Sequence, residues 1–149
     1  MGEVNVFDVA KYILHKNGPI STMKLQKLCY YAQSWSLAWD ETPLFKEDFQ
    51  AWANGPVCPE LFHRHRGLYS VDEKLFKDAD IGKFNDEQKE TIDSVLDYYG
   101  EKNPQWLSEL THSELPWKLT RGDTPPGDFC NRVIEKELMQ SYYGGLNGE

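Results

Sequence analysis

The chain has 149 residues, of which 40% are hydrophobic and 13% aromatic. This is enough apolar material for one folded core, so the composition is not that of a disordered chain. The formal net charge is −8, with 16 Lys and Arg among 24 Asp and Glu, which argues against direct nucleic-acid binding. The apolar stretches fall short of the ~20 residues needed to span a bilayer, and the first residues lack the pattern of a secretion signal. We therefore expect a cytoplasmic protein without a membrane partner.

The three cysteines, Cys29, Cys58 and Cys130, are odd in number and widely spaced. They form no CxxC pair, so the sequence predicts neither a disulfide framework nor a structural zinc site. We expect three reduced thiols and no cofactor.

Two helices are predicted in the first 40 residues. Residues 5–15 carry apolar side chains at spacings of three and four, with Asn5 as a cap and Gly18 at the end. The stronger pattern runs from Ser21 to about Asp40, where either Ser21 or Thr22 can supply the cap. The apolar stripe that places this second helix in the core consists of Leu25, Leu28, Ala32, Trp35 and Trp39.

The middle of the chain has a less regular pattern. Residues 54–57 predict a sharp turn, and Pro59 suits the first turn of a short helix that carries Leu61 and Phe62. Residues 63–66 are expected along the exposed end of this helix. The weakly periodic residues 67–85 indicate a surface connection with short extended pieces.

The last third of the chain is expected to be helical again. The patterns predict helices over residues 86–99, from 103 to 110 and over 116–121. A loop then precedes a final helix from about 128 to 143, and a flexible tail follows over residues 144–149. The inner face of the final helix is expected to present Cys130, Val133, Ile134, Leu138 and Tyr142.

These elements are local and follow one another along the chain. We therefore expect an all-α or mainly α, compact helical bundle, with a minor two-stranded element near residues 68–84. One domain is expected over residues 1–149, with its core at about 6–143.

Cys58, His63 and His65 could be read as metal ligands, but their spacing does not support a site. Zinc sites usually need four ligands with paired spacing, and a fourth ligand is missing here. His63 and His65 would also point about 200° apart on a helix, so they cannot chelate as an i, i+4 pair does. No metal site is predicted.

His112 and Glu114 could be imagined as an acid–base pair, with one cysteine as the nucleophile of a small hydrolase. Nothing in the sequence marks a cysteine as activated. The favoured interpretation is structural: His112 and Glu114 bond to backbone amides at the break before Pro116 and Trp117, and thereby fix how two helices meet.

Residues 54–56 are too short for a glycine-rich phosphate loop, so they are interpreted as a turn. Gly55 there can adopt an unusual φ, and Pro56 keeps Gly55 in an extended conformation.

A partner-binding surface has less definite candidates. Lys24, Gln26 and Lys27 lie between core positions of the second helix, where a solvated helix face is the simpler alternative. The aromatic residues Tyr30, Trp39 and Trp52 are more often core than contact residues, although aromatic side chains also anchor interfaces. The residues assigned to partner binding are Lys24, Lys27, Tyr30, Trp52 and Asn54.

Several motifs in this order resemble the Panacea-domain antitoxin family, which includes SocA-like and phage-associated GepA-like antitoxins. The resemblance covers residues from about 6 to 143. The segments that carry it are residues 9–14 (VAKYIL), 24–33 (KLQKLCYYAQ), 43–45 (PLF), 51–61 (AWANGPVCPEL), 95–100 (VLDYYG), 107–110 (LSEL), 112–117 (HSELPW) and Arg121.

The resemblance implies a bacterial or prophage antitoxin that neutralises a small cognate toxin by direct protein–protein binding. It also leaves a proteolytic adaptor open, since one member of the family delivers its toxin to a protease. Enzymatic activity is not expected. A hydrolase that uses His112, Glu114 and a cysteine is the less favoured alternative.

Overall fold

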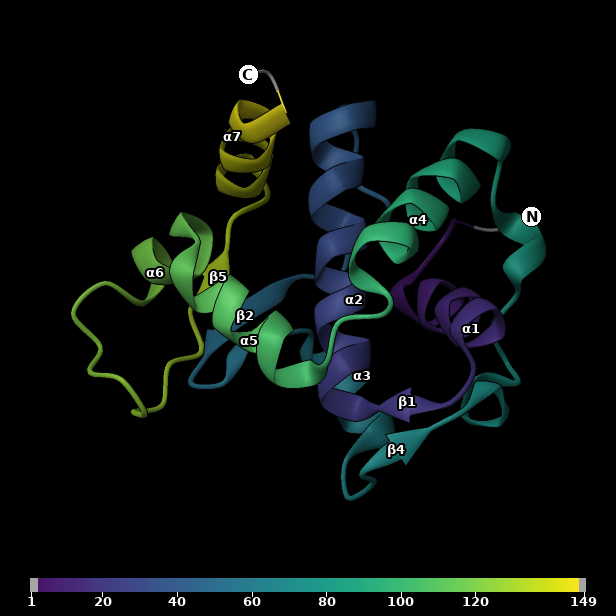
Figure 1. Cartoon of the computed structure of the whole chain (residues 1–149), viewed down its shortest axis with the longest axis horizontal. Helices are drawn as coiled ribbons and strands as arrows, with labels where there is room; N and C mark the ends of the chain where they lie inside the picture. Colours follow the sequence, from purple (N-terminus) through teal and green to yellow (C-terminus); the bar gives the residue numbers. More distant parts are fainter. Residues whose placement is uncertain (1–2, 148–149) are drawn as a thin grey trace.

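The computed structural model describes residues 3–147 of the chain and is mainly α-helical, as predicted. Figure 1 shows the second helix, α2, at the centre, flanked by α1 and α4 on one side and by α5, α6 and α7 on the other. The α-helices of the described residues are α1 (Val6–Asn17), α2 (Thr22–Trp35), α3 (Pro59–His65), α4 (Asp86–Tyr99), α5 (Pro104–Ser113), α6 (Leu115–Arg121) and α7 (Lys136–Asn147).

Helix α1 begins and ends as its sequence predicts. The Asn5 side chain accepts a hydrogen bond from the Asp8 amide at 3.0 Å, and the Asp8 carboxylate accepts one from the Asn5 amide at 2.9 Å. This reciprocal capping box satisfies two amides that would otherwise lack a partner at the first turn. The helix ends at Gly18, whose φ of +81° belongs to the left-handed region that favours glycine.

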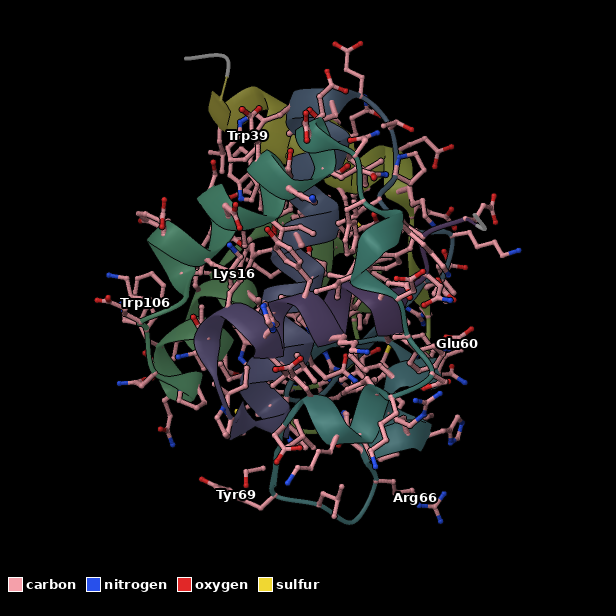
Figure 2. All side chains as sticks on the ribbon, turned by 90° about the vertical axis from the view of Figure 1, so that its right-hand side faces the viewer. Lys16, Trp39, Glu60, Arg66, Tyr69 and Trp106 are labelled. Atoms are coloured by element: carbon pink, nitrogen blue, oxygen red, sulfur yellow. The ribbon has the colours of Figure 1, made fainter. Side chains whose placement is uncertain are left out.

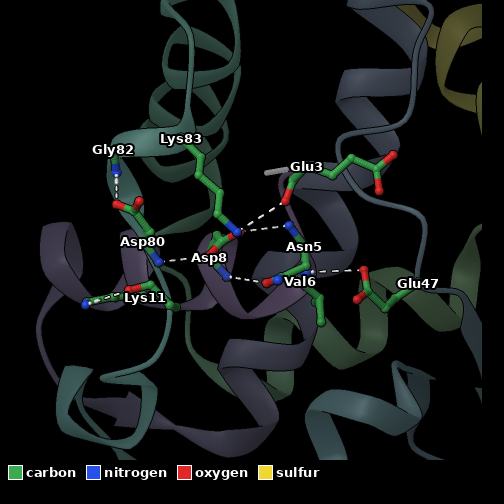
Figure 3. A network of polar contacts seen from close by, with 10 residues as sticks. Glu3, Asn5, Val6, Asp8, Lys11, Glu47, Asp80, Gly82 and Lys83 are labelled. Atoms are coloured by element: carbon green, nitrogen blue, oxygen red, sulfur yellow. Dashed lines mark hydrogen bonds and ion pairs between the residues drawn. The ribbon is translucent and has the colours of Figure 1, made fainter. Parts of the chain in front are cut away.

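The Asp8 carboxylate is completely buried and has several partners (Figure 3). Its second oxygen accepts a hydrogen bond from the Asp80 amide at 2.8 Å. The Lys83 ammonium lies 3.0 Å from the carboxylate and also donates to the Glu3 carbonyl. Asp8 therefore joins the start of α1 to the connection that precedes α4.

Helix α2 forms the centre of the core. The Ser21 hydroxyl caps it by accepting a hydrogen bond from the Lys24 amide at 3.1 Å, and Leu25, Leu28 and Ala32 are fully buried. After Trp35 the chain continues in a π-helical turn, η1 (Ser36–Asp40).

The predicted inward position of Trp39 is wrong, since this side chain is 40% exposed and lies near one end of the molecule (Figure 2). A π-helical turn holds more residues than an α-helical turn, so the extended helix no longer keeps Trp39 on the stripe of α2.

A small sheet, which the sequence patterns do not predict, lies beside α2. Strands β2 (Phe49–Trp52) and β3 (Gly55–Val57) form an antiparallel hairpin, and β5 (Val133–Ile134) pairs with the other edge of β2. The predicted turn at 54–57 is therefore the end of a hairpin whose second strand begins at Gly55.

The predicted two-stranded element near 68–84 is only half correct. Strand β4 (Ser70–Val71) lies in this range, but its antiparallel partner is β1 (Ile20–Ser21), directly before α2. The connection continues through two 3₁₀ turns, η2 (Glu73–Phe76) and η3 (Ile81–Lys83). Figure 2 shows Tyr69, which is 84% exposed, pointing away from the body at the end opposite Trp39.

The final helix starts later than predicted. Residues 133–134 pair with β2 as a strand, so α7 begins at Lys136 instead of about 128. Its buried aromatic residue is Tyr143 and not Tyr142, and Val133 is exposed instead of inward. The expected flexible tail is helical through residue 147, and residues 148–149 lie outside the described part of the chain.

Within residues 3–147, none of the helices combines the length and apolar character needed to span a bilayer.

Candidate recognition pocket

An open pocket of about 420 Å³ lies where α2, the β2–β3 hairpin, α3 and the loop before β5 meet. This volume is in the range that protein sites use to enclose a small ligand or a few side chains. Most of its wall is apolar, and its base includes polar groups from α2. The residues that line it are Thr22, Met23, Gln26, Lys27, Trp52, Ala53, Asn54, Val57, Phe62, His65, Gly127 and Phe129.

Gln26 fixes the elements that form the pocket. Its buried amide accepts a hydrogen bond from the Cys58 amide at 2.9 Å and donates to the Cys58 carbonyl at 3.2 Å, as a neighbouring strand would. Its nitrogen also lies 3.1 Å from Nε2 of His65. Helix α2 is therefore locked to the junction of β3 and α3.

Gln33 repeats this arrangement two turns later. Its side chain accepts from the Leu44 amide and donates to the Phe45 carbonyl, each at 2.7 Å. A polar residue that recurs after seven positions stays on one face of a helix. The alternative of a solvated helix face is wrong for Gln26, because its side chain is 3% exposed, although it lines the pocket.

Lys27 lies under the hairpin, next to Gly55. The φ of Gly55 is +123°, and a Cβ at this position would lie 2.6 Å from Cε and 3.1 Å from Nζ of Lys27. The same Cβ would lie 3.1 Å from the Thr111 hydroxyl oxygen. The positive φ favours glycine here, and an added Cβ would require the end of the Lys27 side chain to move.

The Lys27 ammonium has no counter-charge. The residue is only 1% exposed, and within residues 3–147 its side chain makes neither a hydrogen bond nor an ion pair. Burial lowers the pKa of the ammonium from 10.5 to about 8. The group is therefore still mainly protonated at neutral pH, and it lines the pocket with three unused N–H donors.

His112 is a second incompletely paired group near Lys27. Its ring stacks on Trp117 with centroids 4.1 Å apart, and its buried Nε2 has no hydrogen-bond partner among the described residues. Burial, followed by the positive charge of Lys27, lowers the pKa of His112 below its ordinary value of 6.5. His112 is therefore neutral at pH 7.

Trp117 and Arg121 hold the hairpin from the other side. The Trp117 indole donates to the Trp52 carbonyl at 2.8 Å. The Arg121 guanidinium is 3% exposed and donates to the carbonyls of Ala51, Pro125 and Asp128 at 2.8–3.0 Å. Unlike Lys27, this buried cation donates to backbone carbonyls, so its role is to anchor the hairpin and the following loop.

Glu114 belongs to a separate buried cluster. Its Oε1 accepts hydrogen bonds from the hydroxyls of Tyr31 at 2.8 Å and Tyr143 at 2.7 Å, and burial raises its pKa. The expectation that Glu114 bonds to backbone amides at the helix break is wrong, because the two tyrosines take that position from α2 and α7. Glu114 directly precedes α6 (Leu115–Arg121), and Pro116 is buried in the first turn of this helix.

The candidate metal ligands do not come together. Among the described residues there is no group of three or more His, Cys, Asp or Glu side chains suited to a metal ion. His65 is buried against Gln26 instead of lying on the exposed end of α3, whereas His63 is exposed.

The five residues assigned to partner binding fall into three groups. Lys27, Trp52 and Asn54 line the pocket, whereas Lys24 is half-buried on α2 outside it. Tyr30 is 1% exposed and packs against Phe49 and Tyr143, so its assignment to a surface is wrong. Phe62 and Phe129, two apolar residues of the wall, were not predicted because α3 and the loop meet α2 only in the folded chain.

The sequence also matches known proteins. The model of the family described as "Antitoxin SocA-like, Panacea domain" matches residues 25–118. The chain belongs to this family. The matched range includes Lys27, the hairpin with Gly55, and His112, so the Panacea domain contains the base of the pocket.

Among curated proteins, the chain is similar to "Antitoxin SocA" of Caulobacter vibrioides (strain NA1000 / CB15N). The two are 29% identical over 135 residues, which cover 78% of this chain and 71% of the relative. No solved structure gives a significant match to this Panacea-domain chain.

Proposed function

We propose that this protein is an antitoxin that neutralises a cognate toxin by direct protein–protein binding, and that the face around the pocket is the contact surface. The observation that carries the proposal is the open, mainly apolar pocket, held in place by α2, the hairpin and α3 in a chain of an antitoxin family. The name of the relative from Caulobacter vibrioides supports the same role.

The rim of the pocket has the chemistry of a protein interface. Phe129 is 74% exposed and Met23 39% exposed, and both line the opening beside Trp52. Aromatic residues and methionine are enriched where interfaces are most strongly buried. A partner that covered these side chains would remove apolar surface from water.

Two of the three cysteines and Glu114 are poorly suited to the alternative hydrolase. Burial raises the pKa of the Cys58 thiol to about 12 and that of Cys29 well above 9, so neither forms a thiolate nucleophile at neutral pH. Glu114 is bound by tyrosines, and His112 is stacked on Trp117. These contacts favour a binding protein over an enzyme.

Co-expression with the product of the adjacent gene tests the proposal. We expect this chain to restore the growth of cells that express the toxin and to co-purify with it. Toxicity that this chain does not relieve would contradict the proposed function.

A matched pair of surface variants locates the contact. Phe129→Ala removes an exposed aromatic side chain at the pocket, whereas Tyr98→Ala removes one that is 60% exposed on α4, across α2 from the hairpin (Figure 1). We expect Phe129→Ala to weaken toxin binding by about tenfold or more and Tyr98→Ala to leave it within about threefold. Equal effects of the two variants would place the contact elsewhere.

A further inference from the structure

The base of the pocket holds an ionic group whose partner is absent from the described chain. A buried ammonium is costly unless an anion and hydrogen-bond acceptors compensate it. The sequence nevertheless places Lys27 there, and Gly55 leaves the space that its side chain requires. The unpartnered Nε2 of His112 is a second polar group without compensation in the same region.

The surroundings of Lys27 specify the anion. One ammonium with three N–H donors suits the two oxygens of a carboxylate, whereas phosphate sites commonly use several cations or backbone amides. The pocket is also lined by the apolar side chains of Met23, Trp52 and Phe62. Such a wall accepts the aliphatic stem of an acidic side chain together with an apolar neighbour.

We propose that the toxin inserts a carboxylate into this pocket, where it pairs with the Lys27 ammonium, and that an adjacent apolar residue of the toxin packs against Phe129. The proposal rests on the proposed antitoxin function and adds the chemistry by which the partner is recognised. Its occupant is a protein segment, because the exposed apolar rim continues the contact beyond the volume of a small anion.

The net charge of −8 does not oppose this contact. Charges on the outer surface are screened over about 8 Å at physiological ionic strength, whereas a pair inside the pocket is shielded from salt and water. The acidic exterior thus favours a toxin that is basic overall. The pocket in turn binds one carboxylate of that toxin.

Binding of the purified toxin is measured by calorimetry at pH 7 for the wild type, Lys27→Met and Lys24→Met. Lys24 was also predicted to contact the partner, but it lies on the same helix, half-buried and outside the pocket, so it serves as the matched control. We expect Lys27→Met to weaken binding by about 30-fold or more and Lys24→Met by less than about threefold. Thermal unfolding of each variant confirms that it is folded.

A second arm changes only the toxin, so it does not depend on the folding of a Lys27 variant. Each Asp and Glu of the toxin is replaced by Asn or Gln, and a truncated variant removes its C-terminal carboxylate. We expect one of these changes to weaken binding to the wild type strongly, yet to have little further effect on binding to Lys27→Met.

The outcomes separate the two proposals. A wild-type chain that does not bind the toxin contradicts the proposed function. Tight binding by the wild type and by Lys27→Met alike retains the antitoxin role but overturns the pocket proposal. Loss of binding in Lys27→Met without any coupled toxin carboxylate overturns the carboxylate anchor. Benzoate serves as a small carboxylate probe. If Lys27→Met binds benzoate more weakly than the wild type but binds the toxin equally well, the pocket is a small-molecule site. That result would also overturn the carboxylate anchor.

Discussion

Asp8 and Lys27 are both buried charged side chains, but Asp8 has hydrogen-bond and ionic partners and Lys27 has none within residues 3–147. Asp8 is 0% exposed, and its carboxylate accepts hydrogen bonds from the backbone amides of Asn5 and Asp80 and forms an ion pair with Lys83. Lys27 is 1% exposed and has no such partner within residues 3–147. Buried charges that are fully paired support the fold, whereas an unpaired one lowers stability. This difference places Asp8 in the scaffold, and it is the basis on which we propose that Lys27 takes part in recognition.

The largest effect expected from this comparison follows the substitution Asp8→Ala. It leaves the Asn5 and Asp80 amides and the Lys83 ammonium without their acceptor. We expect the free energy of unfolding to fall by roughly 3–5 kcal/mol, as for other broken buried ion pairs. Chemical denaturation of the wild type and the variant measures the free energy of unfolding. A loss below about 1 kcal/mol would show that Asp8 does not stabilise the fold as proposed.

Gly55→Ala tests the space that Lys27 occupies. The new Cβ would be 2.6 Å from Lys27 Cε and would also require a φ near +123°, which L-residues rarely adopt. We expect the free energy of unfolding to fall by roughly 2–3 kcal/mol. The double variant Gly55→Ala with Lys27→Ala should recover part of this loss in the same denaturation assay, and additive losses would show that the two residues do not compete for space.

Lys27→Met is expected to act in the opposite direction from most substitutions in a core. The difference between pKa values of 10.5 and about 8 corresponds to roughly 3 kcal/mol of destabilisation by the buried charge. A methionine of similar length removes this charge, so we expect stability at pH 7 to rise by roughly 1–3 kcal/mol. A variant less stable than the wild type would indicate that Lys27 has a structural partner.

The pH dependence of stability gives a smaller effect. In the unfolded chain Lys27 has its ordinary pKa of 10.5, and in the folded chain the pKa is about 8. Its cost is therefore complete below pH 8 and disappears as pH rises toward 10.5, because only the folded state releases the proton. We expect the stability gap between Lys27→Met and the wild type to narrow between pH 8 and 10. A constant gap over this range contradicts the lowered pKa.

Affinity for the toxin should fall over the same pH range. His65 and His112, which lie near the pocket base, have lowered pKa values and stay neutral above pH 7. We therefore expect loss of the Lys27 proton to weaken the proposed carboxylate contact. The affinity for the toxin should fall by at most about tenfold for each pH unit above 8. Lys27→Met should lack this dependence in calorimetric titrations at pH 7 and 9.

The sequence predicts the scaffold around Asp8 better than it predicts the pocket around Lys27. The start of α1 at Asn5 and the bounds of α4 follow from local caps and apolar spacing, so these predictions were confirmed. The mainly α class follows from the same patterns. The Asp80 and Lys83 contacts of Asp8, by contrast, join segments more than 70 residues apart and had no local signal.

The elements around the pocket depend on pairing between distant segments. Strand β2 spans only four residues, and β5 is defined by its pairing with β2, so the start of α7 was misplaced. The apolar–polar–apolar alternation of Phe49, Gln50 and Ala51 was the available strand signal in the sequence. Lys27 looked like a surface residue of α2 because the hairpin that buries it comes about 28 residues later; Gly55 was the one local indication of a close approach.

The most direct test is an NMR titration of the Lys27 side chain, free and in complex with the toxin. We predict a pKa near 8 in the free protein, and a clearly higher value in the complex, where the carboxylate stabilises the ammonium. A free value near 10.5, or the same pKa in both states, would contradict the assignment of Lys27 to partner recognition.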